Sequence, residues 1–223
     1  MTLKPGEHLL RLGSPEAYVD AIWQIPGSAV ANLVFAHGAG AGFRHATMQG
    51  LADAFAHEGL STLRFNFPFM QQGKRRVDSI EASIAVIAEA AAFVQSHSDL
   101  PLILAGHSFG GRMCSHAVAE SVVDCSGLIF CSFPLHVAKK PSVKRAAHMP
   151  EIRQPMLFLS GTRDDLADAQ LLREVVGGLH DARIHWLETA NHSYTILKRT
   201  RTNPQPVFEE MAQQARGFVD ALE

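Results

Sequence analysis

A serine, an aspartate and a histidine follow one another along this sequence in an order that suits catalysis by a nucleophilic hydroxyl group. They are Ser108, Asp164 and His192. A serine hydroxyl becomes a good nucleophile when a base takes its proton, and histidine, with an ordinary pKa of about 6.5, suits that task. A carboxylate beside the histidine holds its tautomer and stabilises the imidazolium that forms. These residues therefore predict a Ser-His-Asp triad.

The segment around Ser108 carries the most specific of these signals. An apolar run at 101–104 predicts a buried strand before it, and residues 113–123 predict a helix after it. Gly106 and Gly110 flank the serine because a Cβ at either position would crowd a sharp turn. A strand, Gly-x-Ser-x-Gly and a helix are together typical of the nucleophile elbow of the α/β-hydrolases. The helix N-terminus beside the serine favours developing negative charge.

A glycine-rich loop at 37–42 follows an apolar run at 31–36 and permits two interpretations. A dinucleotide-binding loop is disfavoured, because Phe43 stands at the third glycine position and no acid ends the next strand. We favour an oxyanion hole, in which the backbone N–H groups of Ala39 and Phe109 bind the negatively charged oxygen of an acyl-transfer intermediate.

Several residues near these loops are predicted to line the substrate pocket. For the two phenylalanines, which end the strand predicted at 60–67, simple core packing is an equally good interpretation. The predicted lining residues are His37, Gly38, Gly40, Phe67, Phe69 and His107.

The choice of acid and base rests on position after a strand. Asp164 stands nearest a strand end in a Gly-x-x-Asp turn, whereas Asp165 or Asp168 would also serve as a cap for the next helix. Among 12 histidines, His192 has both the loop position and the order that a base requires.

No metal or other cofactor is expected. A metal site built from His37, His45 and His192 is disfavoured, because no cluster of acids accompanies it.

Strands and helices alternate along the chain, which predicts an α/β fold with a mostly parallel sheet covered by helices on both faces. The loops with the glycines, Ser108, Asp164 and His192 each follow a strand directly, so the carboxyl edge of the sheet should collect them. Residues 137–150 are basic and irregular, and they predict a minimal lid over an open, shallow site. The predicted strands are 7–12, 18–25, 31–36, 60–67, 101–104, 127–131, 155–160 and 183–187, and the predicted helices are 48–57, 80–94, 113–123, 169–179 and one that starts at Pro206.

Composition limits the remaining possibilities. A chain of 223 residues fits a single domain, 1–223. Its net charge of −2 predicts no electrostatic attraction to nucleic acid or to an anionic membrane. We find neither a signal peptide nor a membrane span. Three unevenly spaced cysteines predict reduced thiols in a cytoplasmic protein. We expect either a monomer or a homodimer.

The chain also resembles the compact α/β-hydrolases related to dienelactone hydrolase, and in particular a group that includes a testis-expressed protein and a subunit of a chromatin-acetylating complex. This resemblance implies the α/β-hydrolase fold with Ser108, Asp164 and His192 as the triad. The chain departs from the group at His107 and Phe109 beside the serine, and at Asp165-Leu166 after the acid, where the group tends to have Pro-Phe. The matching pieces are His37–Gly40, Arg64–Pro68, Gly106–Met113, Phe133–His136, Lys140-Pro141, Gly161–Asp164 and Asn191–Ser193.

We therefore expect a serine hydrolase that cleaves small carboxylic esters or thioesters through an acyl-enzyme, without a cofactor. The short segment at 137–150 would leave a long acyl chain uncovered, which disfavours a dedicated lipase. Two alternatives remain open. One is an acyltransferase, in which an alcohol or an amine replaces water. The other is a non-catalytic interaction module that retains the fold.

Overall fold

Eight strands form one sheet in the order β1-β2-β4-β3-β5-β6-β7-β8. The structure, a computed structural model, describes residues 3–222, so residues 1, 2 and 223 of the predicted domain lie outside it. β1 and β2 form an antiparallel hairpin at one edge, and β3 to β8 run parallel. This arrangement confirms the predicted fold class. The strands are Gly6–Ser14, Ala17–Ile25, Ala31–Ala36, Leu60–Phe65, Leu102–His107, Gly127–Cys131, Met156–Gly161 and Ala182–Leu187.

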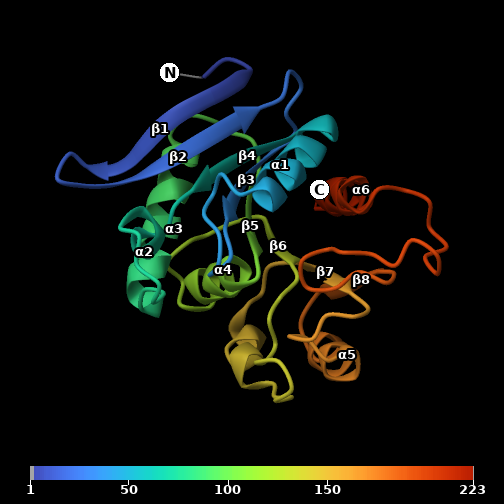
Figure 1. Ribbon diagram of the computed structural model, residues 1–223. Coiled ribbons are helices and arrows are strands. Elements are labelled where there is room, and N and C mark those ends of the chain that lie inside the picture. The colour runs from blue at the N-terminus through green and yellow to red at the C-terminus, as the bar shows by residue number, and fades with distance from the viewer. Residues whose placement is uncertain (1–2, 223) are drawn as a thin grey trace.

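Helices cover both faces of the sheet (Figure 1). Apolar residues of α1 and α6 pack on one face, and those of α3, α4 and α5 pack on the other. Two short 3₁₀ turns lie in the segment between β6 and β7. Within the described residues, no helix is long and apolar enough to cross a membrane. The helices are α1 Ala46–His57, α2 Pro68–Gln71, α3 Ile80–Gln95, α4 Phe109–Ala119, α5 Ala169–Gly177 and α6 Val207–Val219, and the 3₁₀ turns are η1 Lys144–Ala146 and η2 Met149–Glu151.

The central strands are buried on both sides, and this explains why their sequences are mostly apolar. Every residue of β3, β6 and β7 is buried. Successive side chains of a strand point to opposite faces, so Leu33 and Phe35 enter the core under α1 and α6. Val34 and Ala36 enter the core under α3 and α4. A strand held in this way cannot shift along its neighbours without moving polar groups into a core.

Several predicted boundaries differ from the structure, and three of them lie beside the presumed site. β5 runs on to His107, three residues beyond the end predicted at Leu104. α4 starts at Phe109, directly after the serine, and not at Met113. Gly110 and Gly111 occupy its first turn despite their poor helix propensity, because close packing there excludes larger residues. The strand predicted at 60–67 ends at Phe65, since Pro68 opens the short helix α2.

Candidate active site

Ser108 occupies a sharp turn between β5 and α4. Its backbone has φ of 52° and ψ of −114°, a conformation that costs a non-glycine residue about 1–3 kcal/mol. The flanking glycines permit it. A Cβ on Gly106 would lie 2.3 Å from the Gly111 nitrogen, and a Cβ on Gly110 would lie 2.3 Å from the carbonyl oxygen of Ala36. Main chain surrounds both positions, so neither contact could relax by a side-chain movement.

His192 connects the serine to an acid through two hydrogen bonds. Its Nε2 lies 2.9 Å from Oγ of Ser108, and its Nδ1 lies 2.8 Å from Oδ2 and 3.0 Å from Oδ1 of Asp164. Nδ1 donates to the carboxylate, which leaves Nε2 as the acceptor for the serine hydroxyl. The arrangement is that of a base held in the tautomer it needs to remove the serine proton.

The structure distinguishes among the three aspartates that follow β7. Asp164 is buried, contacts His192, and accepts a third hydrogen bond from the backbone N–H of Leu166 (2.8 Å). Asp168 caps α5 instead, because its carboxylate accepts from the backbone N–H groups of Gln170 and Leu171. Asp165 is exposed.

One backbone and one side-chain hydrogen bond join the loop that carries Asp164 to the loop that carries His192. The N–H of Arg163 donates to the carbonyl of Ala190 (2.9 Å), and the N–H of Thr189 donates to Oγ1 of Thr162 (2.9 Å). Gly161 permits this approach, since a Cβ there would lie 2.3 Å from the Ala190 oxygen. The loops of Asp164 and His192 are therefore held together independently of any contact with Ser108.

Asn191 shapes the turn on which the base lies. Its side-chain oxygen accepts from the N–H groups of Ser193 (3.1 Å) and Thr195 (2.9 Å). Tyr194 adopts a φ of 64° in this turn, and its buried ring lies 5.6 Å from the ring of His107. The turn is thus held from within and by packing on the nucleophile strand.

His37, Phe67 and Phe69 do not line the cavity at Ser108, contrary to the prediction. All three are fully buried. Nδ1 of His37 donates to the carbonyl of Gly38 (2.7 Å), and Nε2 accepts from the N–H of Phe67 (3.0 Å). Burial lowers the pKa of His37 to about 4, so the ring is neutral near pH 7. The two phenylalanines pack against His37 and Phe109. These side chains support the glycine loop from the core side.

The predicted oxyanion donors, the backbone N–H groups of Ala39 and Phe109, have no hydrogen-bond partner in the part of the chain that the structure describes. Phe109 is the first residue of α4, where the positive end of the helix dipole adds to the attraction. Ala39 lines the same cavity as Ser108, and Phe109 directly follows the serine in the chain.

A cavity of about 340 Å³ opens at Ser108. It includes the predicted residues Gly38, Gly40 and His107, and it receives none of the residues 137–151. His45, Thr47 and Met48 also line it, and none of the three was predicted to line the substrate pocket. Other hollows are larger, but the one between the hairpin turn and α3 contains no serine, histidine or cysteine. The complete lining is Gly38, Ala39, Gly40, Ala41, His45, Thr47, Met48, His107, Ser108, His192 and Ser193.

His107 connects the nucleophile strand to the loop of the base. Its ring lies 5.5 Å from the ring of His192, and Nε2 lies 3.4 Å from the carbonyl oxygen of His192, a long hydrogen bond. Burial, reinforced by the charge of His192, lowers the pKa of His107 to about 4. A Cβ on Gly38 would lie 2.9 Å from Nδ1 of His107, so the glycine loop is packed directly on this ring.

His136 braces the loop of the acid, a role that sequence reasoning missed. Its backbone N–H donates to the carbonyl of Leu166 (2.9 Å), and its Nε2 accepts from the N–H of Asp168 (2.9 Å). Nδ1 donates to the carbonyl of Val137 (3.0 Å), which fixes the ring. A signal for this role was available in the sequence. His136 follows the strand predicted at 127–131, and the Asp164 loop follows the next strand along the chain, predicted at 155–160.

Residues 29–220 match the family model of the alpha/beta hydrolase domain. Solved structures with the same fold cover nearly the whole chain at low sequence identity. Dienelactone hydrolase from Anabaena variabilis has a TM-score of 0.77 at 18% identity, covering 98% of this chain and 99% of its own. A serine hydrolase without a lid from Xanthomonas campestris has a TM-score of 0.68 at 18% identity, covering 100% and 95%. Est1E from Butyrivibrio proteoclasticus, solved with ferulic acid bound, has a TM-score of 0.75 at 12% identity, covering 96% and 98%.

Proposed function

Since the chain belongs to the alpha/beta hydrolase family, we propose that it is a serine hydrolase that cleaves small carboxylic esters or thioesters. The observation that carries this proposal is the continuous hydrogen-bond chain from Ser108 through His192 to Asp164 at the wall of a cavity. A scaffold has no physical need for a buried carboxylate, an oriented imidazole and a strained serine at one place.

In the proposed reaction, Oγ of Ser108 attacks the carbonyl carbon of the substrate while Nε2 of His192 takes the hydroxyl proton. Asp164 accepts the Nδ1 hydrogen bond throughout and stabilises the imidazolium. The carbonyl oxygen becomes an oxyanion, and the N–H groups of Ala39 and Phe109 are the donors that would bind it. Nε2 then gives its proton to the leaving alcohol or thiol, and an acyl-enzyme remains.

Water completes the cycle in the same geometry. Nε2 of His192 takes a proton from water, which attacks the acyl carbon and forms a second tetrahedral intermediate. Collapse of this intermediate releases the carboxylic acid and returns the proton to Oγ of Ser108. Nε2 of His192 must be unprotonated before the first step, because it is the acceptor for the serine proton.

The cavity supports the choice of a small substrate. Six of its 11 lining residues are glycine, alanine or serine, and its volume of about 340 Å³ lies near the lower end for small-molecule sites. The segment between β6 and β7 contributes no residue to it. A long acyl chain would therefore remain in solvent. It would gain no binding energy there, because its apolar surface would not be removed from water.

The direct test is the intact mass of the protein after exposure to a small fluorophosphonate, with Ser108→Ala beside it. We expect one covalent adduct on the wild type and none on the variant, because only an activated serine reacts. Ser126→Ala is a matched control and should label as the wild type does. Ser126 is exposed, and its backbone N–H donates to the carbonyl of Leu102, at the end of β5 opposite to Ser108. The next measurement is the turnover of short-chain esters and thioesters by the untreated protein.

Absence of an adduct on well-folded wild type would contradict the proposal and favour a non-catalytic module. An adduct on Ser108→Ala would contradict the choice of nucleophile. Product analysis with added alcohol or amine separates hydrolysis from acyl transfer, because a transferase forms a new ester or amide in place of the free acid.

A further inference from the structure

β1 is the outermost strand of the sheet, and within residues 3–222 it pairs with β2 alone. Figure 1 shows β1, in blue, at the rim of the molecule. The open edge of a strand presents N–H and C=O groups that can form a ladder with a strand of another molecule. Which residues present these groups follows from the register of the hairpin.

Three residues of β1 direct their backbone groups outward. The carbonyl of Asp20 in β2 accepts from the N–H of Asn66, which follows β4 (3.0 Å), so Asp20 faces away from β1. Arg11 lies directly opposite Asp20 in the ladder. In an antiparallel pair of this kind both residues face away from each other, and the direction alternates along the strand. The outward N–H and C=O groups are therefore those of Glu7, Leu9 and Arg11.

The side chains of the same three residues share one exposed face, because they alternate with the residues that face the core. Leu9 is 71% exposed, the largest exposure of any large apolar side chain in residues 3–222. Glu7 lies 3.8 Å from Arg64, and Arg11 lies 3.9 Å from Asp20, distances too long for hydrogen bonds. A hollow of about 560 Å³ beside Leu9 and Arg11 leaves room for side chains of a second molecule.

We propose that two copies of this chain associate through β1, paired antiparallel so that Leu9 faces Leu9 of the second copy. In this register Glu7 of each copy faces Arg11 of the other. Each facing pair exchanges both N–H···O bonds, since all the residues involved point outward. The ring of Tyr18 lies 4.3 Å from the guanidinium of Arg11. This contact restricts the arginine before association and lowers the entropy cost of pairing it.

The charges select this register over its neighbours. A shift of one residue places outward groups opposite groups that already bond to β2. A shift of two places Leu9 opposite Glu7 or Arg11 and loses the charge pairs. A shift of four places Glu7 or Arg11 opposite itself, where like charges repel. In the proposed register Gly13 faces Pro5, which has no N–H, so the ladder ends there.

The test is sedimentation velocity at low ionic strength on the wild type, Glu7→Arg, Arg11→Glu and an equimolar mixture of the two variants. A single strand edge is a small interface, so we expect a reversible wild-type dimer with a Kd of about 10–100 µM. Each variant alone should dimerise about tenfold more weakly, because its facing pairs carry like charges. The mixture should recover the wild-type affinity, because every facing pair then holds one acid and one base.

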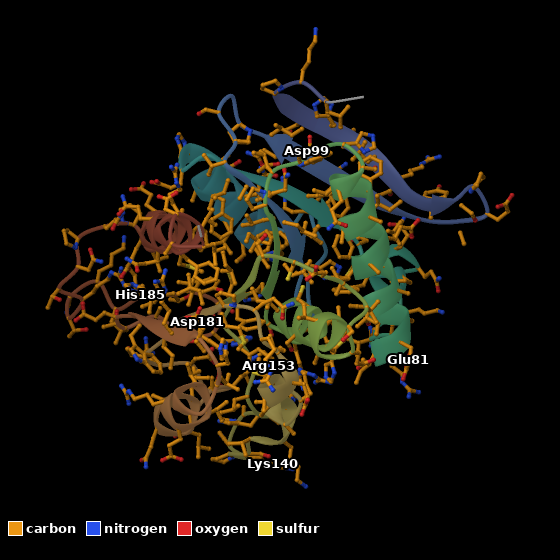
Figure 2. All side chains as sticks on the ribbon, turned by 180° about the vertical axis from the view of Figure 1, so that it is seen from behind. Glu81, Asp99, Lys140, Arg153, Asp181 and His185 are labelled. Atoms are coloured by element: carbon orange, nitrogen blue, oxygen red, sulfur yellow. The ribbon has the colours of Figure 1, made fainter. Side chains whose placement is uncertain are left out.

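Two control variants make the same charge changes outside the ladder. Glu16→Arg lies in the exposed turn of the same hairpin, and Lys140→Glu lies in the exposed segment between β6 and β7. Figure 2 shows Lys140 at the lower edge of the molecule and the hairpin at the upper right. Both controls should dimerise within about twofold of the wild type.

Three results would overturn the proposal: a wild type that stays monomeric up to about 0.5 mM, equal losses in the controls, or a mixture that associates no better than its separate variants. Unchanged dimerisation of Glu7→Arg and Arg11→Glu would equally exclude this surface. Melting temperatures of all variants guard against misfolding, and recovery in the mixture is itself evidence that both variants are folded. Dimerisation needs no turnover, so its failure and the failure of the proposed hydrolase activity are separate results.

Discussion

Oγ of Ser108 and Nε2 of His192 lie 2.9 Å apart, although 84 positions separate these residues in the sequence. The contact joins the turn after β5 to the turn after β8, with β6 and β7 between them in the sheet. It forms because the carboxyl ends of parallel strands meet at one edge, where their loops converge. His107 adds a second connection, through its contact with the carbonyl of His192. The following predictions depend on this geometry and on the packing that supports it.

Asp164→Asn should lower kcat for ester hydrolysis by about 10³–10⁴, because an amide no longer holds His192 in the tautomer that accepts the serine proton. Asp165→Asn is the matched control, since Asp165 is exposed, and its kcat should stay within about twofold of the wild type. The measurement is initial rates on a short-chain ester. Equal losses in the two variants would mean that Asp164 has no special role.

Asp168→Ala should lower the free energy of unfolding by about 1 kcal/mol, because it leaves the first N–H groups of α5 without their cap. Urea denaturation measures this change. Esterase activity should remain near that of the wild type, since the Asp168 side chain does not contact His192. A large loss of activity with unchanged stability would reverse the roles assigned to Asp164 and Asp168.

Gly110→Ala should lower the free energy of unfolding by about 3 kcal/mol or more, because the new methyl group would lie 2.3 Å from the carbonyl oxygen of Ala36. Gly217→Ala in α6 is the matched control. Its methyl group would meet nothing within 4 Å, so helix propensity should raise stability by about 0.5 kcal/mol. Thermal and urea unfolding of both variants test this contrast. Similar stabilities for the two variants would show that the elbow has room for a side chain.

Acidification should destabilise the fold through His37 and His107, whose pKa values are lowered to about 4. Above about pH 6.5 neither state binds the proton, and between about pH 6.5 and 4 only the unfolded chain binds it. Each group should therefore lower the free energy of unfolding by about 2 kcal/mol at about pH 5.

His107→Gln isolates one of these contributions. The fall in the free energy of unfolding between about pH 7.5 and 5 should be about 2 kcal/mol smaller in this variant than in the wild type. His180→Gln, at an exposed position, should show the full fall. Identical falls in all three proteins would mean that His107 takes up its proton in the folded state at its ordinary pKa.

Much of the fold could be predicted because local patterns decide it. The strands predicted at 31–36 and 127–131 have the same bounds in the structure, since short, mostly apolar runs between turn residues fit buried parallel strands. The start of α4 was predicted four residues late because glycines in a first turn contradict helix propensity. The structure explains these glycines: the backbone of Gly106 and of Ala36 lies so close to the first turn of α4 that a Cβ would not fit there.

The sequence by itself determined the α/β order of elements and the placement of Ser108, the acid and His192 in loops after strands, because both follow from short-range periodicity and chain order. Tertiary structure alone decided that Asp164 contacts His192 while Asp168 caps a helix. It also buried His37, Phe67 and Phe69 and brought His45 to the cavity. These outcomes depend on distances between residues far apart in the chain, which no local pattern encodes.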